Sequence, residues 1–421
     1  MQEDQTAPSD SINASAAQRL LALFFFLNFS AVALTAVYLP LHFKAQGFTS
    51  AQIGLLGVGS ALATILLAPR YGHLYDHSNS RRQILLFTLA LTSLLIIVAP
   101  FLRIFALLLL VYALNRVGMG AMISASENMA YQVGEMHDAD KSAQENSFGK
   151  MRLWGSVGFA IFAFLGGFLF DRFGIKANLL GFSVITLVLA WVLLRLPQAV
   201  FYAQETPDAS NRLSISQVVK LILQDPALLF CILALALTDP VADGVRSFEN
   251  IFMSDLGQPA WVIGIMANLA AVLEVPSMLR ASQLQSRFGT QKVLRFVFVF
   301  DLIRRGMVFF FPLASVVFLS SVLNSITYPL RLIGMVSLIN ARLPRRYTTT
   351  AFSFVGVTLV GLGYIGSNLV AGYLYERFGG ASNYLLSSVL LAMGLVLILI
   401  AGRYDWSAPP IKEKPLSDPE L

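Results

Sequence analysis

Long apolar runs separated by short polar loops set the pattern of this chain. Runs of roughly 20 mostly apolar residues, the length that an α-helix needs to cross a bilayer, recur from Arg19 to Ala401. The pattern predicts an all-α polytopic membrane protein with twelve transmembrane helices. The predicted spans are 19–43, 51–72, 83–102, 104–127, 148–170, 176–196, 226–253, 259–281, 292–311, 313–338, 348–373 and 382–402.

The composition and the polar segments agree with a membrane protein. Hydrophobic residues make up 56% of the chain and charged residues only 13%, whereas about 25% charged residues is usual for a soluble domain. Most Lys and Arg residues of the predicted loops fall on the face that carries both termini, so the positive-inside rule places both termini in the cytoplasm. The formal net charge of +6 then reflects topology and implies no nucleic-acid partner. Residues 1–18 lack a cationic region followed by an apolar run, so we expect no cleaved signal peptide.

The chain divides into two similar halves. A polar break at 197–218 leaves six predicted spans on each side. The sequence GFLFDRFG at 167–174 matches GYLYERFG at 372–379, at the ends of spans five and eleven. A parallel repeat of this kind predicts two pseudo-symmetric six-helix bundles, as in transporters that bind solute near the bilayer midplane. The predicted parts are a cytoplasmic tail 1–18, bundles 19–196 and 226–402, a cytoplasmic linker 197–225 and a tail 403–421.

The loop after the second span carries a recognisable motif. It reads GHLYDHSNSRR and contains Gly72, Asp76, Arg81 and Arg82. This loop resembles the GxLxDRxGRR motif of the major facilitator superfamily, with Asn79 where that motif has glycine. The resemblance implies a gating loop in which Asp76 pairs with an arginine in one state of the transport cycle. The alternative is a solvated turn with surface charges.

Ionisable side chains at membrane depth are the candidate site in the first half. Such residues cost at least about 2.5 kcal/mol to insert, so they normally face a polar cavity or a partner. Span four carries Arg116 and Glu127 on nearly the same helical face, and span five places Arg152, Ser156 and Phe159 along one stripe. We predict that these five residues bind substrate. Snorkelling to the headgroups is the alternative for Arg152 and the expected role of its neighbour at position 150.

The second half carries its own charges at membrane depth. They are Asp239, Asp243, Arg246, Glu249, Glu274, Asp301, Arg304, Arg305 and Arg331. Glu274 has no charged neighbour in its own span, and an apolar surrounding favours the protonated form that a proton carrier needs. We predict that Glu274, Asp301, Arg304 and Arg331 serve proton coupling, with Arg304 or Arg331 acting on Glu274. Asp239 precedes Pro240, which favours a cap or kink residue, and one of the adjacent Arg304 and Arg305 is expected to point away from the cavity.

These residues also resemble a known subgroup of the superfamily. FGKMRLWGSVGF at 148–159 is similar to the start of span five in the lactose permease and phenylpropionate-permease-like subgroup, and the resemblance covers nearly the whole chain. It implies that Glu127 and Arg152 grip solute hydroxyls, with Phe159 in the place of a stacking tryptophan. Asn324 and Thr327 stand where lactose permease has its proton-coupling histidine and glutamate, so its coupling residues do not all carry over.

The sequence therefore predicts a secondary active transporter and no enzyme. We expect a monomeric, proton-coupled symporter of the cell inner membrane that imports a sugar, an aromatic or other carboxylate, or a nucleoside by alternating access. No GxxxxGK[ST] loop is present, and the single cysteine, Cys231, and the four histidines form no metal-ligand motif, so no cofactor or metal is expected. An exporter of drugs or metabolites is the main alternative, although span five lacks the proline common in exporters. A receptor with this fold is less favoured, because residues 1–18 and 403–421 are short for an output domain.

Overall fold

The computed structural model describes residues 14–137, 141–201 and 215–404, and these ranges contain helices and no strand. Eleven helices in these ranges are long and apolar enough to cross a membrane, which confirms the all-α polytopic fold. The ninth predicted span is a helix as well, α11 (Thr290–Phe310). It is less apolar than the others because Asp301 and two adjacent arginines lie in its centre. The two predicted tails lie mostly outside the described residues.

The chain forms two compact units. Unit 1 contains Met1–Ala36 and Ala63–Thr206, and unit 2 contains Val37–Leu62 and Pro207–Leu421. Helix α3 (Ser50–Asp76) is divided between them. Residues 37–62 thus group with unit 2, whereas the sequence repeat places them in the first bundle, and the bundle boundaries at 196 and 226 stay a prediction.

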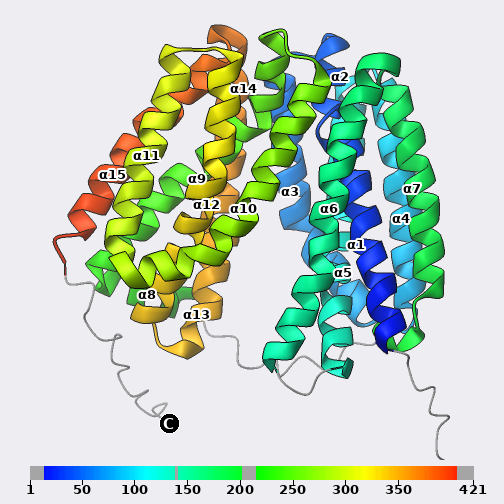
Figure 1. The fold of residues 1–421 in the computed structure, drawn as a ribbon, viewed down its shortest axis with the longest axis horizontal. Helices are drawn as coiled ribbons and strands as arrows, with labels where there is room; N and C mark the ends of the chain where they lie inside the picture. Colours follow the sequence, from blue (N-terminus) through cyan, green and yellow to red (C-terminus); the bar gives the residue numbers. More distant parts are fainter. Residues whose placement is uncertain (1–13, 138–140, 202–214, 405–421) are drawn as a thin grey trace, which may run out of the picture. The chain divides into compact units, whose positions relative to one another are not determined.

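Unit 1 is built around helix α1. Its elements are α1 (Ala14–Ala36), α4 (Arg81–Val98), η1 (Ala99–Phe101), α5 (Phe105–His137), α6 (Lys141–Phe173), α7 (Ile175–Arg195) and η2 (Gln198–Phe201). Helix α1 packs against α5, α6 and α7 (Figure 1). Gly158 permits the close approach of α6 to α1, because a Cβ there would come within 2.2 Å of the Phe26 carbonyl oxygen.

Helices α5 and α6 extend beyond the predicted spans 104–127 and 148–170. The prediction rested only on the apolar runs, but the flanking polar residues, such as Gln132 and Gln144, are compatible with a helix. The two helices therefore continue past the apolar stretch, and Glu127 and Arg152 lie well inside them and not at their ends.

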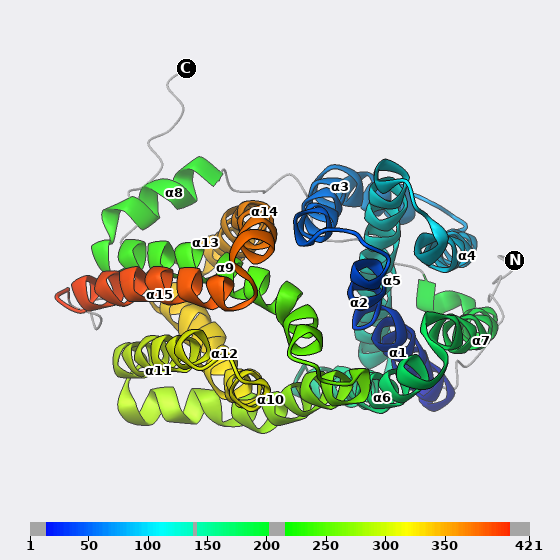
Figure 2. The ribbon, with the colours of Figure 1, turned by 90° about the horizontal axis from the view of Figure 1, so that it is seen from above.

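Unit 2 holds the remaining helices. They are α2 (Leu39–Ala45), α8 (Ile215–Gln224), α9 (Pro226–Asp255), α10 (Ala260–Phe288), α11, α12 (Ala314–Arg342), α13 (Arg345–Phe352), η4 (Ser353–Val360), α14 (Gly361–Phe378) and α15 (Ala381–Ala401). Helix α9 packs against α12, α14 and α15, and α12 packs against α10 and α11 (Figure 2). The eleventh predicted span is α-helical at both ends but contains a π-helical stretch, η4, which apolar patterning cannot reveal.

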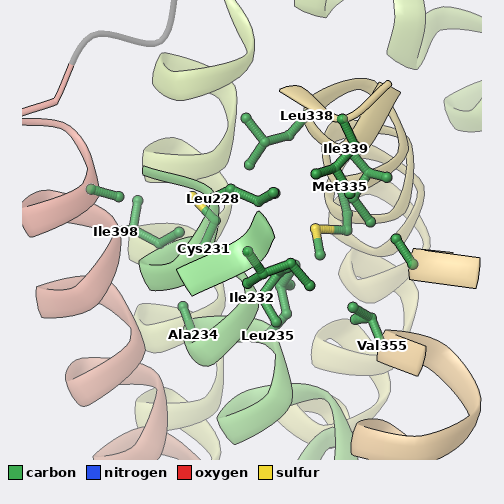
Figure 3. Close-up of a cluster of buried hydrophobic side chains, with 14 of the residues drawn as sticks. Leu228, Cys231, Ile232, Ala234, Leu235, Met335, Leu338, Ile339, Val355 and Ile398 are labelled. Atoms are coloured by element: carbon green, nitrogen blue, oxygen red, sulfur yellow. The ribbon is translucent and has the colours of Figure 1, made fainter. Parts of the chain in front are cut away.

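One end of unit 2 has a core of buried hydrophobic side chains. Figure 3 shows Leu228, Cys231 and Ile232 of α9 facing Met335 and Leu338 of α12. Cys231 is fully buried there, so it serves packing.

A buried ion pair between Asp225 and Arg342 lies at this end of unit 2. Asp225 caps α9 by accepting a hydrogen bond from the Leu228 amide at 3.2 Å, and its carboxylate also accepts from Arg342 Nη2 of α12 at 2.9 Å. The pair therefore joins the first turn of α9 to the last turn of α12.

Polar contacts hold residues 37–62 to the rest of unit 2. The ammonium of Lys44 pairs with Asp255, and the Tyr375 hydroxyl donates to the same carboxylate at 2.6 Å. The Ala51 amide at the start of α3 donates to Glu376 Oε2 at 3.0 Å. These contacts explain why the start of α3 belongs to unit 2 by packing.

Candidate functional site

Arg152 and Glu127 meet in unit 1. Arg152 Nε of α6 lies 3.7 Å from Glu127 Oε1 of α5, and the two side chains are 33% and 41% exposed. The Arg152 guanidinium also lies 4.2 Å from the ring centroid of Phe29 and 5.9 Å from that of Phe25, both on α1. A carboxylate, a planar guanidinium and an aromatic face are thus gathered at membrane depth, where they remain accessible.

The other predicted substrate residues of unit 1 lie along the same helices. Ser156 and Phe159 follow Arg152 on α6, and both are partly buried. Arg116 is exposed on α5, but eleven residues separate it from Glu127, a rise of about 16 Å along the helix axis. The structure therefore brings Glu127 and Arg152 together and leaves Arg116 about three turns away.

A cluster of paired charges around Asp301 lies in the interior of unit 2. Asp301 of α11 is fully buried and accepts hydrogen bonds from Arg304 Nη2 at 3.0 Å, Thr327 Oγ1 at 2.7 Å and Arg331 Nη1 at 3.0 Å. Because charge-assisted hydrogen bonds are strong and an unpaired buried charge is costly, these donors hold Asp301 as a carboxylate with a fixed geometry.

Arg304 and Arg331 also contact residues other than Asp301. Arg331 Nε lies 2.9 Å from Asp239 Oδ1 of α9. Arg304 donates to the Ser320 carbonyl at 2.8 Å and to Asn324 Oδ1 at 3.0 Å, both on α12. Asp239 is therefore an ion-pair partner and more than the cap or kink residue expected from its position before a proline. Its partner lies 92 positions away on another helix, which no local pattern reveals.

Both adjacent arginines of α11 are buried, but they serve different neighbours. Arg304 belongs to the cluster around Asp301, whereas Arg305 points toward α15 and donates to Ser387. Nearby, Glu249 of α9 accepts hydrogen bonds from Ser321 at 3.1 Å and from Tyr384 at 2.9 Å. The two side chains thus diverge as expected, and Arg304 is the one that contacts Asp301 and the polar residues Ser320 and Asn324 of α12.

Glu274 lies outside this cluster. It is partly buried on α10, and it is absent from the ion pairs of the described residues. The expected action of Arg304 or Arg331 on Glu274 stays a prediction. Those two arginines are already engaged by Asp301. The Arg246 guanidinium of α9 lies 5.6 Å from the ring centroid of Tyr328 on α12.

The predicted gating loop is held by main-chain contacts. Arg81 donates to the carbonyl of Tyr75 at 3.2 Å and to that of Phe201 at 2.9 Å. Arg82 donates to the carbonyl of Leu196. Within the described part of the chain, the Asp76 carboxylate forms no ion pair, so the expected pairing with an arginine is not formed in this structure. The gating role remains a prediction.

The sequence analysis did not predict the aromatic residues that lie beside Arg152 and Arg246. Phe25 and Phe29 lie one helical turn apart in the run FFFLNF of α1. Five of the six residues in this run are apolar, so the sequence does not show which of its faces meets Arg152. Tyr328 stands directly before Pro329 and carries no local sign of its contact with Arg246.

Charged groups inside membrane-spanning helices are typical of the solute and ion pathways of membrane transporters. The model of the "MFS_1 like family" matches residues 19–386, so the chain belongs to that family and is a transporter of the major facilitator superfamily. Transporters of this kind are not enzymes.

Known proteins resemble the chain over nearly its full length. The maltose permease of Geobacillus stearothermophilus is 27% identical over 395 residues, which cover 93% of this chain and 96% of the permease. The lactose permease of Citrobacter freundii is 23% identical over 82% of this chain and 85% of its own. The multidrug resistance protein MdtG of Proteus mirabilis (strain HI4320) is 23% identical over 93% of this chain and 97% of its own.

Solved structures share the fold. The nucleoside transporter NupG matches with a TM-score of 0.75 at 16% identity and covers 92% of this chain and 100% of its own. A bacterial homologue of the human lysosomal transporter Spinster, in an inward-facing and unoccupied conformation, matches with a TM-score of 0.67 at 17% identity and covers 94% of this chain and 98% of its own. At these identities the likeness supports the fold alone.

Proposed function

We propose that the protein is a proton-coupled symporter that imports a small solute rich in hydroxyl groups, a sugar or a nucleoside, by alternating access. The observation that carries this proposal is the Glu127–Arg152 pair lying against Phe29. A carboxylate accepts hydrogen bonds from hydroxyls, and a guanidinium donates two parallel ones to neighbouring oxygens. The flat ring beside them suits the apolar face of a sugar or a base.

The relatives support this substrate class. The curated relatives include a maltose permease and a lactose permease, and both names state a sugar. An aromatic or other carboxylate is less favoured, because Glu127 would repel it at the same place. We assign Ser156, Phe159 and Arg116 to further solute contacts along α5 and α6, and we propose a monomer in the cell inner membrane with both termini in the cytoplasm.

We assign proton transfer to Glu274. Asp301 is fixed by hydrogen bonds from three residues and is poorly placed to gain and lose a proton in each cycle, whereas Glu274 is partly buried and stands outside that cluster. Arg304 and Arg331 act in this proposal as fixed positive charges that keep Asp301 ionised. Protonation of Glu274 lowers the cost of moving the loaded carrier through its occluded state.

Uptake into proteoliposomes tests the proposal. Purified protein is reconstituted, and uptake of labelled maltose and uridine is measured with and without an inside-alkaline pH gradient. We expect accumulation above equilibrium only with the gradient. Glu274→Gln is expected to abolish accumulation but to keep solute exchange, because a glutamine imitates the protonated carboxyl and releases no proton.

Asp171→Asn is the matched control, since it also removes one carboxylate but at the exposed end of α6. Accumulation that is indifferent to the gradient and to Glu274→Gln contradicts proton coupling. The similarity to the multidrug resistance protein MdtG favours one second candidate, an exporter of drugs. Gradient-driven transport of ethidium, with no transport of maltose or uridine, would support that candidate instead.

A further inference from the structure

Hydrogen-bond donors without partners lie where α11 begins and α15 ends. These two helices pack side by side in unit 2 (Figure 1 and Figure 2). A Cβ atom on Gly402, the residue that ends α15, would clash with the Arg295 guanidinium and come within 2.5 Å of Gln291 Nε2, so both side chains of α11 lie against this helix end. Arg295 Nε and Gln291 Nε2 are buried, and neither has a hydrogen-bond partner among the described residues. Because an unpaired buried donor is costly, this place calls for an acceptor.

The same end of unit 2 carries positive charge without acidic partners. Lys292 in the first turn of α11 and Arg403 directly after α15 are exposed, and Arg295 is partly buried. No Asp or Glu occurs at 275–300 or at 377–404. Within the described part of the chain, none of these three cations forms an ion pair.

Two general effects explain only part of this arrangement. The positive-inside rule accounts for exposed cations in a loop, and the dipole of α15 favours a cation at the C-terminal end of that helix. Neither effect supplies an acceptor for the buried donors of Arg295 and Gln291. The arrangement therefore suits an anion that offers several acceptor oxygens.

The surface of α11 beside these donors is apolar and exposed. Phe296, the residue after Arg295, is 56% exposed, and Val299 is 41% exposed. The rings of Phe296 and Phe300 stack with their centroids 5.6 Å apart. An exposed apolar surface on a helix of the membrane-spanning bundle contacts lipid acyl chains. An anion that carries acyl chains would therefore meet both the donors and this surface, whereas a free anion would meet only the donors.

We propose that Gln291, Arg295 and Arg403 bind the phosphate group of an anionic phospholipid, and that its acyl chains lie along Phe296. A guanidinium donates two parallel hydrogen bonds to phosphate oxygens, and the Gln291 amide donates a further one. Basic pockets between membrane helices are known sites for such head groups. The inference is independent of the proposed function, because it involves neither the solute nor the proton.

Thermal unfolding of the purified full-length protein in detergent tests the inference. The melting temperature is measured with added phosphatidylglycerol, with phosphatidylcholine of the same acyl chains, or with inorganic phosphate. A ligand that binds only the folded protein stabilises it, so phosphatidylglycerol should raise the melting temperature more than phosphatidylcholine does, and inorganic phosphate should leave it unchanged. Equal stabilisation by the two lipids, or by inorganic phosphate and phosphatidylglycerol, would overturn the inference.

Two variants separate the geometry of the site from its charge. Arg295→Gln should weaken phosphatidylglycerol binding, titrated in the same assay, by roughly 10- to 100-fold, the effect of losing charge-assisted hydrogen bonds. Gly402→Ala keeps every charge, but its Cβ would displace the Arg295 guanidinium, so it should weaken binding as well. Each variant is compared in phosphatidylglycerol and phosphatidylcholine, so that a change in its own stability cancels. An unchanged phosphatidylglycerol response in either variant would show that the inference is wrong.

Arg195→Gln is the matched control. Arg195 is an exposed arginine at the end of α7 in unit 1, where its guanidinium lies 5.3 Å from the ring centroid of Trp191. Its replacement removes the same charge and should leave the response to phosphatidylglycerol as it is in the wild type. A loss equal to that in Arg295→Gln would mean that the lipid responds only to net charge, and the inference would then be wrong while the proposed function stands.

Discussion

Asp301→Asn should destabilise the protein by about 3–5 kcal/mol, the usual cost of breaking a buried ion pair from one side. Asp301 is fully buried and is bonded to two arginines that are each nearly buried themselves. An asparagine keeps the shape but removes the negative charge, so Arg304 would lose the carboxylate it pairs with, and Arg331 would keep only Asp239. Thermal unfolding in detergent, followed by tryptophan fluorescence, should show a large fall in the melting temperature.

A charge-balanced double variant separates charge from packing. Arg304→Gln should also destabilise the protein by itself, because Asp301 loses a donor. Combined with Asp301→Asn, it removes one charge of each sign, and the double variant should recover much of the lost stability. A coupling energy near zero in this double-mutant cycle would show that the Asp301–Arg304 contact contributes nothing beyond its two members.

The apolar runs were sufficient to predict the membrane-spanning helices but not their full course. The first span, predicted as one helix at 19–43, is broken into α1 and α2, with a turn at Val37 and Tyr38. Pro40 in the first turn of α2 explains the break, because proline has no N–H to continue a helix from the preceding turn. The break after α1 could therefore be predicted from Pro40 in the sequence. The apolar pattern gives no sign of the π-helical stretch η4.

The sequence also indicated which charges lie at membrane depth, but not how they pair. Glu127 and Arg152 were matched through a resemblance, and they lie within 3.7 Å of each other. The hydrogen-bond partners of Asp301 depend on the rotation of α11 and α12 about their own axes. Consecutive residues lie about 100° apart around a helix axis, so rotating a helix by that angle replaces one neighbour by another. No local sequence pattern determines the rotation of a helix to within this angle.

The charged residues at membrane depth divide into two groups by what they touch. Asp301, Arg304 and Arg331 compensate one another within the interior of unit 2. Arg152 and Arg246 instead lie on aromatic rings and remain accessible. Removing a member of the first group should affect stability. The largest effect on solute binding is expected from the removal of Arg152.

Arg152→Ala should weaken binding of maltose or uridine by more than about 100-fold while leaving the fold intact. Two charge-assisted hydrogen bonds of about 1.5–3 kcal/mol each would be lost, and Glu127 would lose its counter-ion at the place where the solute binds. The stability should change little, because the Arg152–Glu127 pair is 33% and 41% exposed and an accessible ion pair contributes at most about 1 kcal/mol. Isothermal titration and thermal unfolding of the same preparation measure the two effects.

Lys150→Gln provides the control on the same helix. Lys150 lies two residues before Arg152 and is exposed, and on an α-helix that separation turns its side chain by about 200°, away from Glu127. Its replacement removes the same charge but should leave solute affinity as it is. An equal loss of binding in both variants would mean that net positive charge near the start of α6 attracts the solute. A loss in Arg152→Ala alone, with partial recovery in Arg152→Lys, would mean that the guanidinium itself contacts the solute, because only the charge and not the paired donors survives in lysine.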